Sequence, residues 1–215
     1  MLQDVVLKPL SDGKIERAAI ILHGLGDNAA GIMGLGEVFR KILPDTLFLA
    51  PDAPFACPHV QGGFQWFGSE DWTPKVILEG IENAAPHLNA YIDYVLETYK
   101  LAPEKLALIG FSQGTMMSLY VAPRRTPSLA GILGYSGALF GDENLKDDKK
   151  SSPPVQLIHG MMDPVVPFAC MDAAENGLKK AEIPVHSLEC PGLDHGVDER
   201  GLHEGVVFLH SIFKM

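Results

Sequence analysis

Short, continuous apolar runs alternate along this chain with stretches whose apolar residues recur at helical spacing, and this alternation constrains the fold most. The runs are typical of buried strands and cover residues 18–22, 46–50, 106–109, 129–135, 155–159 and 185–190. Helical spacing marks residues 76–96, 115–122, 168–180 and 203–213. Strands that alternate with helices predict right-handed crossovers, and therefore an α/β fold with a mostly parallel central sheet covered by helices on both faces.

Two segments that contain proline interrupt this pattern. Pro86 lies inside the first helical stretch and predicts a break or kink there. Residues 54–74 carry five aromatic side chains among glycines and prolines, which is too aromatic for a solvated linker and too interrupted for regular structure. We expect an ordered flap in this segment.

Size and charge narrow the classes of function. The 215 residues suffice for one sizeable core, so we expect a single domain over residues 1–215. A formal net charge of -10 repels nucleic-acid phosphates and anionic lipid headgroups. No run approaches the ~18 apolar residues of a membrane span, and residues 1–10 lack the pattern of a signal peptide. We expect a soluble, cytoplasmic protein with no nucleic-acid partner and no stable membrane insertion.

The sequence Gly110-Phe111-Ser112-Gln113-Gly114 is a G-x-S-x-G element between a predicted strand and a predicted helix. A sharp turn in this context projects the serine hydroxyl outward, and the two glycines prevent clashes. The positive end of the following helix favours an oxyanion, for which the Gln113 backbone N–H is one donor. Ser112 is therefore the candidate nucleophile, although the motif by itself also fits an ordinary turn serine.

Two later loops supply an acid and a base in the chain order that such a serine requires. Asp163 follows the predicted strand 155–159, where its carboxylate can accept a hydrogen bond from an imidazole N–H. His195 follows the strand 185–190 and is flanked by glycines that allow it to lean over Ser112. Asp163 as a helix cap and His195 as an exposed loop histidine are the alternatives. The common order of the three residues favours catalysis.

Other residues with chemical potential are weaker candidates. His23 and His159 each precede a glycine at a predicted strand end, and we interpret both as structural. Asp194 is a rival acid, but an adjacent residue seldom reaches its neighbour's ring in the required plane. Cys57 and Cys170 lack a glycine-rich turn like that around Ser112, so the sequence gives little support for catalysis by a thiol. The chain has no H-E-x-x-H or similar helical pair, so we expect neither a catalytic metal nor a cofactor.

Together these motifs resemble the phospholipase/carboxylesterase family of small α/β hydrolases, which includes acyl-protein thioesterases and bacterial carboxylesterases. The resemblance spans nearly the whole chain and rests on residues 23–27, 51–54, 110–114 and 159–167 and on the loop around His195.

This resemblance implies an α/β-hydrolase fold without a lid domain and assigns a catalytic triad to Ser112, Asp163 and His195. It further implies that the Leu25 backbone N–H joins that of Gln113 in an oxyanion hole. Thr115 departs from the family pattern, since similar proteins usually carry a second glycine there, and this departure puts the close packing of the following helix in question.

The connections around the predicted site bear on its substrate. Only 18 residues separate Tyr135 from Pro154, which leaves no room for the helical lid of true lipases, so we expect an open pocket. Phe64, Trp66 and Trp72 are candidates for the border of an acyl groove, and the family resemblance places a corresponding loop beside the nucleophile. Ordinary core packing is the alternative. We expect hydrolysis of short- to medium-chain acyl esters or thioesters through an acyl-enzyme.

Fold and triad leave the physiological substrate open. An acyl-protein thioesterase or a lysophospholipase is the first alternative, followed by a peptidase, a lactone hydrolase and a binding module without turnover. The substrate is accordingly a small acyl ester or thioester, or an acylated protein. Similar proteins are often dimers, and the sequence leaves a homodimer open.

Overall fold

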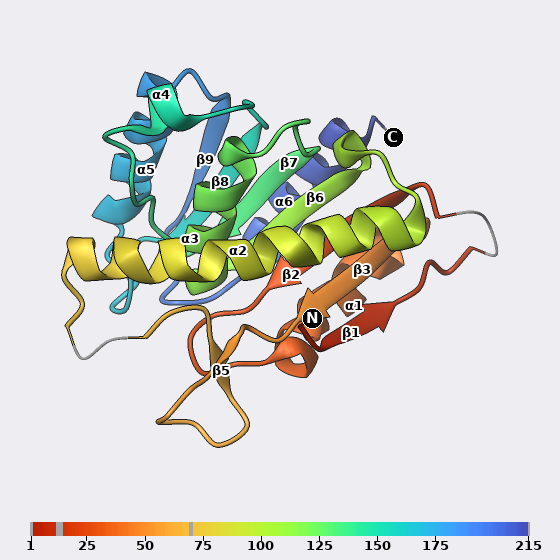
Figure 1. Cartoon of the computed structure of the whole chain (residues 1–215), viewed down its shortest axis with the longest axis horizontal. Helices are drawn as coiled ribbons and strands as arrows, with labels where there is room; N and C mark the ends of the chain where they lie inside the picture. Colours follow the sequence, from red (N-terminus) through yellow and green to blue (C-terminus); the bar gives the residue numbers. More distant parts are fainter. Residues whose placement is uncertain (1, 12–14, 69–70, 215) are drawn as a thin grey trace.

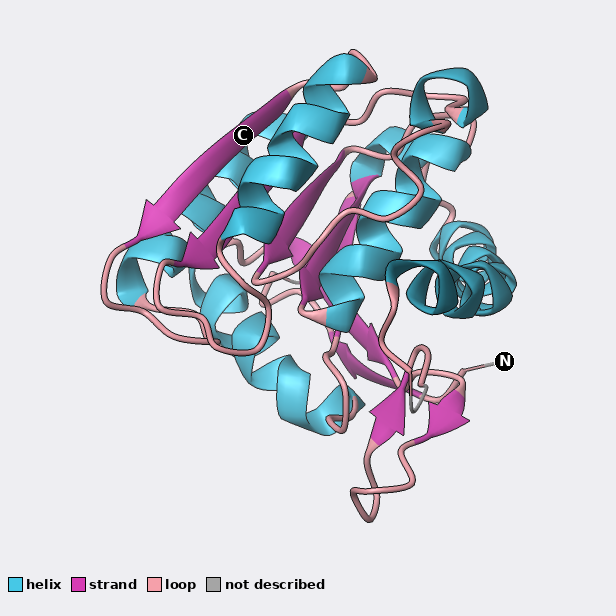
Figure 2. Ribbon diagram, turned by 90° about the vertical axis from the view of Figure 1, so that its left-hand side faces the viewer, coloured by secondary structure: helices cyan, strands magenta, loops and turns pink. Residues whose placement is uncertain are grey.

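A seven-stranded sheet runs through the middle of the molecule, with helices packed on both of its faces (Figures 1 and 2). The computed structural model describes residues 2–11, 15–68 and 71–214. In spatial order the strands are β1 (Asp4–Leu7), β3 (Thr46–Pro51), β2 (Arg17–Leu22), β6 (Leu106–Phe111), β7 (Gly131–Tyr135), β8 (Val155–Gly160) and β9 (Val185–Cys190). Strand β1 is antiparallel to β3, and all the other neighbours in this sheet are parallel.

Among the residues that the structure describes, six helices connect or follow these strands. They are α1 (Ala29–Ile42), α2 (Pro74–Tyr99), α3 (Gln113–Val121), α4 (Leu145–Asp148), α5 (Ala169–Lys180) and α6 (Glu199–Phe213), with short 3₁₀ turns at Pro103–Lys105 and Ala122–Arg124. None of the helices in the described ranges is both long and apolar enough to span a bilayer.

The core consists of two apolar layers, one on each face of the sheet. Side chains alternate between the faces of a strand. Along β2, Ala18, Ile20 and Leu22 therefore pack in the layer that contains α2, α3 and α5, whereas Ala19 and Ile21 pack in the layer that contains α1 and α6. This arrangement confirms the mostly parallel, doubly covered sheet predicted from the sequence.

The predicted strands and helices are all present, with strand ends that differ by at most two residues. The structure corrects two other expectations, one for the segment 54–74 and one for Pro86. The segment 54–74 contains regular structure after all, because β4 (Phe55–Ala56) and β5 (Phe64–Gln65) form a short antiparallel hairpin whose loop projects from the body of the molecule (Figure 1). Sequence analysis also did not identify β1, α1 or α4.

Pro86 does not break its helix. Helix α2 continues through the proline from Pro74 to Tyr99. A proline inside a helix removes one backbone hydrogen bond. Ala84, Ala85 and Leu88 on either side are nevertheless buried in the apolar layer, so packing against the neighbouring elements holds the helix together at this point.

Parallel pairing places the carboxyl ends of β6, β8 and β9 at one edge of the sheet, with β7 between β6 and β8. The loops that follow these ends carry Ser112, Asp163 and His195. The connection from β7 to β8 contains only the single turn of α4. Catalytic groups in open α/β sheets gather at this edge.

Candidate active site

Ser112 occupies a strained turn between β6 and α3. Its backbone lies at φ 53° and ψ -116°, a combination that residues other than glycine rarely adopt. The flanking glycines make the turn possible. A Cβ at Gly110 would lie 2.4 Å from the Thr115 backbone nitrogen, and one at Gly114 would lie 2.0 Å from the Leu22 carbonyl oxygen. The G-x-S-x-G spacing is thus a steric requirement of the turn.

The Tyr135 carbonyl at the end of β7 fixes this turn. It accepts a hydrogen bond of 3.0 Å from the Ser112 backbone N–H and another of 2.8 Å from the Thr115 hydroxyl. Thr115, the departure from the family pattern, is therefore integrated into the turn, and its side chain is buried.

Two glycines provide the room that Thr115 needs. A Cβ at Gly134 would lie 2.6 Å from the Thr115 methyl carbon, and one at Gly137 would lie 2.4 Å from the Thr115 Cβ. Both distances are far below a normal contact. Thr115 adds side-chain volume on α3, and Gly134 and Gly137, which face it, have no side chains. Close packing of α3 is therefore preserved.

The compensation between the Thr115 side chain and the missing side chain at Gly137 can be tested. We expect Gly137→Ala to lower the free energy of unfolding by about 1–3 kcal/mol through overpacking against Thr115. In a Thr115→Gly background the same change should cost much less, because the remaining neighbour, the Ser112 carbonyl oxygen, lies at 3.1 Å. Urea unfolding of the four variants gives the coupling energy. Additive effects of the two substitutions would contradict the proposed compensation.

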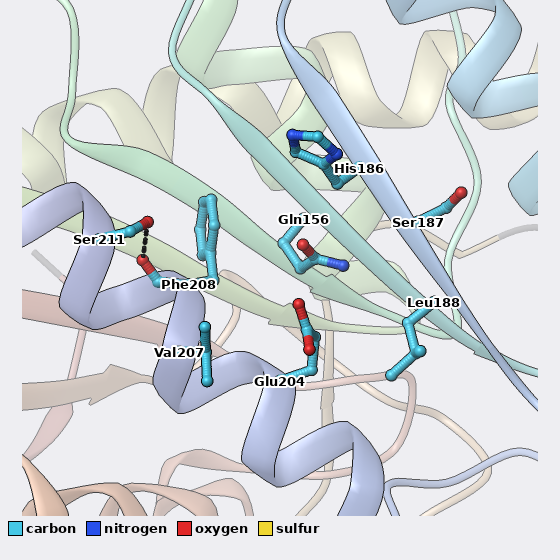
Figure 3. A pocket seen from close by; sticks show the side chains of 8 residues that line it. All are labelled: Gln156, His186, Ser187, Leu188, Glu204, Val207, Phe208 and Ser211. Atoms are coloured by element: carbon cyan, nitrogen blue, oxygen red, sulfur yellow. Dashed lines mark hydrogen bonds between the residues drawn. The ribbon is translucent and has the colours of Figure 1, made fainter.

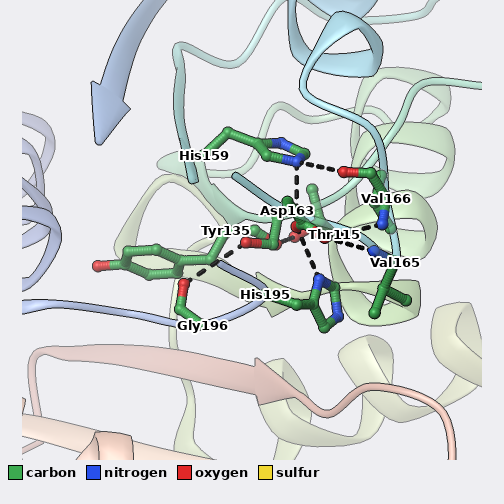
Figure 4. Close-up of polar contacts among 9 residues, drawn as sticks. Thr115, Tyr135, His159, Asp163, Val165, Val166, His195 and Gly196 are labelled. Atoms are coloured by element: carbon green, nitrogen blue, oxygen red, sulfur yellow. Dashed lines mark hydrogen bonds and ion pairs between the residues drawn. The ribbon is translucent and has the colours of Figure 1, made fainter. Parts of the chain in front are cut away.

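Asp163 accepts hydrogen bonds through both oxygens of a buried carboxylate (Figure 4). Its Oδ1 accepts the backbone N–H groups of Val165 at 2.8 Å and Val166 at 2.9 Å. Its Oδ2 lies 2.8 Å from His195 Nδ1 and 3.2 Å from His159 Nε2. Burial by itself raises the pKa of Asp163, but the hydrogen bonds from His195, Val166 and Val165 outweigh it and leave the pKa below its ordinary value. The carboxylate is therefore ionised at neutral pH.

The loop that carries His195 is fastened to the loop that carries Asp163. Met161 N–H donates to the Cys190 carbonyl at 3.0 Å, and Met162 N–H donates to the Leu193 carbonyl at 2.9 Å. Gly160 permits this approach, since a Cβ there would lie 2.3 Å from the Asp194 carbonyl oxygen. These contacts fix the His195 loop beside the carboxylate.

His195 also lies beside the serine turn. Its ring centroid is 4.9 Å from that of Phe111, the residue before Ser112. Between the described residues His195 forms a hydrogen bond with Asp163 but none with Ser112. Catalytic hydrogen bonds of this kind are often long before substrate binds. The structure thus brings the three predicted residues to one edge, with one of their two expected hydrogen bonds formed.

The loop after β2 also lies beside Ser112. A Cβ at Gly24 would be 3.2 Å from the Ser112 Cβ, which shows how closely the loop approaches. His23 holds it: its Nδ1 donates to the Gly24 carbonyl at 2.7 Å, and its Nε2 accepts the Ala53 N–H at 2.9 Å. Burial lowers the pKa of His23, so the ring is neutral in this tautomer. The structural interpretation of His23 agrees with these contacts.

The backbone N–H groups of Leu25 and Gln113, the residues expected to form an oxyanion hole, have no hydrogen-bond acceptor within the described part of the chain. The Gln113 side chain, in contrast, is buried and fully engaged: its Oε1 accepts the Trp66 N–H at 3.1 Å, and its Nε2 donates to the Phe67 carbonyl at 2.7 Å. Gln113, the residue that follows Ser112, therefore holds the aromatic segment in place.

The three aromatic candidates for substrate binding lie in different surroundings. Trp66 is completely buried, and its indole N–H donates to the His23 carbonyl at 3.1 Å, in agreement with the core-packing alternative. Phe64 is half-buried and joins the loop after β2, because its backbone exchanges hydrogen bonds with Gly26 and Asp27. Trp72 is 49% exposed. Only Phe64 and Trp72 are accessible to a substrate.

A depression of about 400 Å³ lies elsewhere, between α6 and the strands β8 and β9 (Figure 3). Its lining includes His186 and Glu204 but none of the residues described above. Within the described ranges, no group of three or more His, Cys, Asp or Glu side chains is arranged to hold a metal ion.

Sheet order, helices on both faces and a strained serine turn between β6 and α3 define the α/β-hydrolase fold. The family model described as Phospholipase/Carboxylesterase matches residues 9–212. The chain therefore belongs to the phospholipase/carboxylesterase family and is a hydrolase of carboxylic ester bonds, as the sequence motifs predicted.

Individual relatives agree with this assignment. The chain is 30% identical over 209 residues to acyl-protein thioesterase 1 of Gibberella zeae, which covers 89% of this chain and 88% of that protein. It is 29% identical over 212 residues to acyl-protein thioesterase 1 of Kluyveromyces lactis, with 91% and 92% covered. The crystal structure of esterase PE8 superposes with a TM-score of 0.94 at 34% identity and covers 98% of this chain and 99% of that one.

Proposed function

We propose that this chain is a serine esterase or thioesterase in which Ser112 is the nucleophile, His195 the general base and Asp163 the residue that orients the base. The observation that carries the proposal is the His195–Asp163 hydrogen bond at the sheet edge where Ser112 occupies its strained turn. Because all three residues follow strands of one sheet, we also propose that residues 1–215 act as a single domain.

The geometry supports a two-step reaction. His195 donates a hydrogen bond from its Nδ1–H to Asp163 and keeps that proton, which leaves the Nε2 lone pair free to take the Ser112 hydroxyl proton. The Ser112 oxygen then forms a bond to the acyl carbonyl carbon, while the Leu25 and Gln113 N–H groups stabilise the negative oxygen. The C–O or C–S bond of the substrate breaks as His195 protonates the leaving group, and an acyl-enzyme remains. Water activated by His195 releases the acid and restores Ser112.

The rim of the site favours apolar acyl groups. Met162 and Val165, on either side of Asp163 along the chain, are 67% and 64% exposed, and Leu25 and Met161 are also exposed. Exposed apolar side chains beside a reactive centre are typical of sites that bind apolar groups. With Phe64 and Trp72 nearby along the flap and no lid, we propose short- to medium-chain acyl esters or thioesters as substrates.

The leaving group separates the remaining candidates. The relatives named acyl-protein thioesterase favour a thioester on a protein as the second candidate. A lysophospholipid, a peptide and a lactone are compatible with the same three residues.

A covalent probe and a substrate series test the proposal. A fluorophosphonate should label Ser112, as located by peptide mass, and turnover of p-nitrophenyl esters should reach its maximum at short to medium chain length and fall for palmitate. An ester, a thioester and an amide with the same acyl group then identify the leaving group. Absence of both labelling and turnover would favour a binding module, and turnover with the label on another residue would refute the role of Ser112.

A further inference from the structure

Trp66, a candidate for substrate binding in the sequence, bonds instead to both elements that carry the proposed oxyanion donors. Its side chain is completely buried. Its indole N–H donates to the His23 carbonyl at 3.1 Å, and its backbone N–H donates to Gln113 Oε1 at 3.1 Å. One residue of the flap thus joins the loop after β2 to the start of α3.

The loop after β2 is held on both sides of Leu25 by the same short piece of the flap. On one side is the indole bond to the His23 carbonyl. On the other side, Gly26 N–H donates to the Phe64 carbonyl at 2.8 Å, and Phe64 N–H donates to the Asp27 carbonyl at 2.8 Å. Leu25 therefore lies between two positions that are bonded to the same segment.

The Gln113 side chain fastens this segment to the start of α3. Besides the bond from Trp66, its Nε2 donates to the Phe67 carbonyl at 2.7 Å, and the residue is 3% exposed. The backbone N–H groups of Leu25 and Gln113 must point at one substrate oxygen, so their separation has to be fixed to within about 0.5 Å. Residues 64–67 form a bridge between the elements that carry the two donors.

We propose that Trp66 is a positioning residue for the oxyanion hole: its indole N–H fixes the loop that carries Leu25 relative to the Gln113 backbone N–H. The inference rests on the proposed function, in which Ser112 is the nucleophile. The bonds that Phe64 makes to the loop come from its main chain and survive any substitution there except proline. The indole bond, in contrast, depends on the identity of the side chain.

Packing is the alternative role of Trp66, so the test requires a matched control. The Trp66 ring belongs to the apolar layer that contains α2 and α3, and its centroid lies 6.0 Å from that of the His23 ring. Ile81, on α2, is completely buried in the same layer. Trp66→Phe removes the indole N–H together with part of the ring, whereas Ile81→Val removes apolar volume and no hydrogen-bonding group.

Trp66→Phe is expected to lower kcat by about 10- to 100-fold with little change in KM. A displaced oxyanion donor stabilises the transition state less but changes little in the binding of the neutral ester. Ile81→Val should keep both constants close to those of the unmodified protein. Rates are referred to active sites counted with the fluorophosphonate, so that misfolded protein does not contribute.

A trifluoromethyl ketone gives a readout that a packing defect would not move. The Ser112 oxygen adds to its carbonyl carbon, the hydroxyl proton passes to His195, and the carbonyl oxygen becomes an oxyanion. In Trp66→Phe its inhibition constant should rise by the factor by which kcat/KM falls. The methyl ketone with the same chain, which binds as a neutral carbonyl, should retain its inhibition constant.

A double-mutant cycle tests whether the bridge transmits the effect. Gln113→Met removes both side-chain bonds to residues 66 and 67 and keeps the backbone N–H at position 113. Once the bridge is detached from α3, the indole bond no longer fixes one donor relative to the other. Trp66→Phe should therefore reduce kcat much less in the Gln113→Met background than in the unmodified protein.

Three results would overturn the proposal. They are an unchanged inhibition constant of the trifluoromethyl ketone in Trp66→Phe, equal losses of affinity for the two ketones, and losses of kcat that multiply in the double variant. If Trp66→Phe does not fold, benzothienylalanine at position 66 replaces the indole N–H by sulfur at nearly constant volume, and the same rise is expected. Failure of the proposed function is recognised separately in the unmodified protein, where the fluorophosphonate would not label Ser112 and the trifluoromethyl ketone would not inhibit.

Discussion

Ser112→Ala is expected to abolish ester turnover, with kcat reduced by about 10³-fold or more. Without the hydroxyl no acyl-enzyme forms, and only the oxyanion donors and the binding of substrate remain. Alanine shares the Cβ of serine, so the backbone at φ 53° is no more strained than before and the fold should be preserved. Hydrolysis of p-nitrophenyl butyrate measures the reduction in kcat, and thermal unfolding verifies that the variant is folded.

Helix α3, which begins directly after Ser112, contains a second serine that provides a matched control. The Ser118 hydroxyl is buried and donates to the Gly114 carbonyl at 2.8 Å, away from the reactive position. Ser118→Ala should leave kcat close to that of the unmodified protein and should not reduce fluorophosphonate labelling. Full turnover in Ser112→Ala, or equal losses in both variants, would exclude Ser112 as the nucleophile.

Asp163→Asn is expected to reduce kcat by about 10³- to 10⁴-fold with little change in KM. The two backbone N–H groups at Oδ1 retain the amide oxygen of asparagine, so the NH₂ group takes the place of Oδ2. There it faces His195, which donates a hydrogen bond to Oδ2 in the native structure. His195 must then accept at Nδ1 and carry its proton on Nε2, the atom that has to take the proton from Ser112.

The neighbouring carboxylate provides the control for this prediction. Asp194 is exposed and forms no hydrogen bond with His195 within the described ranges. Asp194→Asn removes the same charge one residue away from the base and should change kcat less than about threefold, since exposed charges interact weakly through water. If the Asp194 variant were the more severely impaired of the two, the acid would be assigned to Asp194.

Regular, strongly apolar elements were the part of the fold that sequence could predict. A buried parallel strand such as β6 is apolar on both faces and therefore stands out as a continuous run. Strand β1 does not, because it is an edge strand of only four residues, one of them exposed and the other three half-buried. Helix α1 contains Gly31, Gly34 and Gly36, which weaken the helical pattern. Its capping by Asn28 was the available signal.

Some features of the candidate site could likewise be predicted from the sequence, and others could not. Ser112, Asp163 and His195 follow predicted strands and could be assigned by motif and chain order. The burial of Trp66 and the contact between His159 and Asp163 could not, because both depend on how loops from different strands meet. One signal was available for His159: it precedes Asp163 by four residues across a single tight turn.

The way in which Gln113 holds the aromatic segment has a consequence for how this enzyme can diversify. The Gln113 side chain binds the main chain at Trp66 and Phe67 and no side chain there. Main-chain groups are the same whatever residue carries them, so neighbouring exposed positions such as Trp72 can be exchanged without loosening the turn that presents Ser112. Under the proposed function, substitutions in the flap would change the acyl preference without altering the turn that carries Ser112. A library that varies the flap while retaining Gln113 would test whether the two properties can change independently.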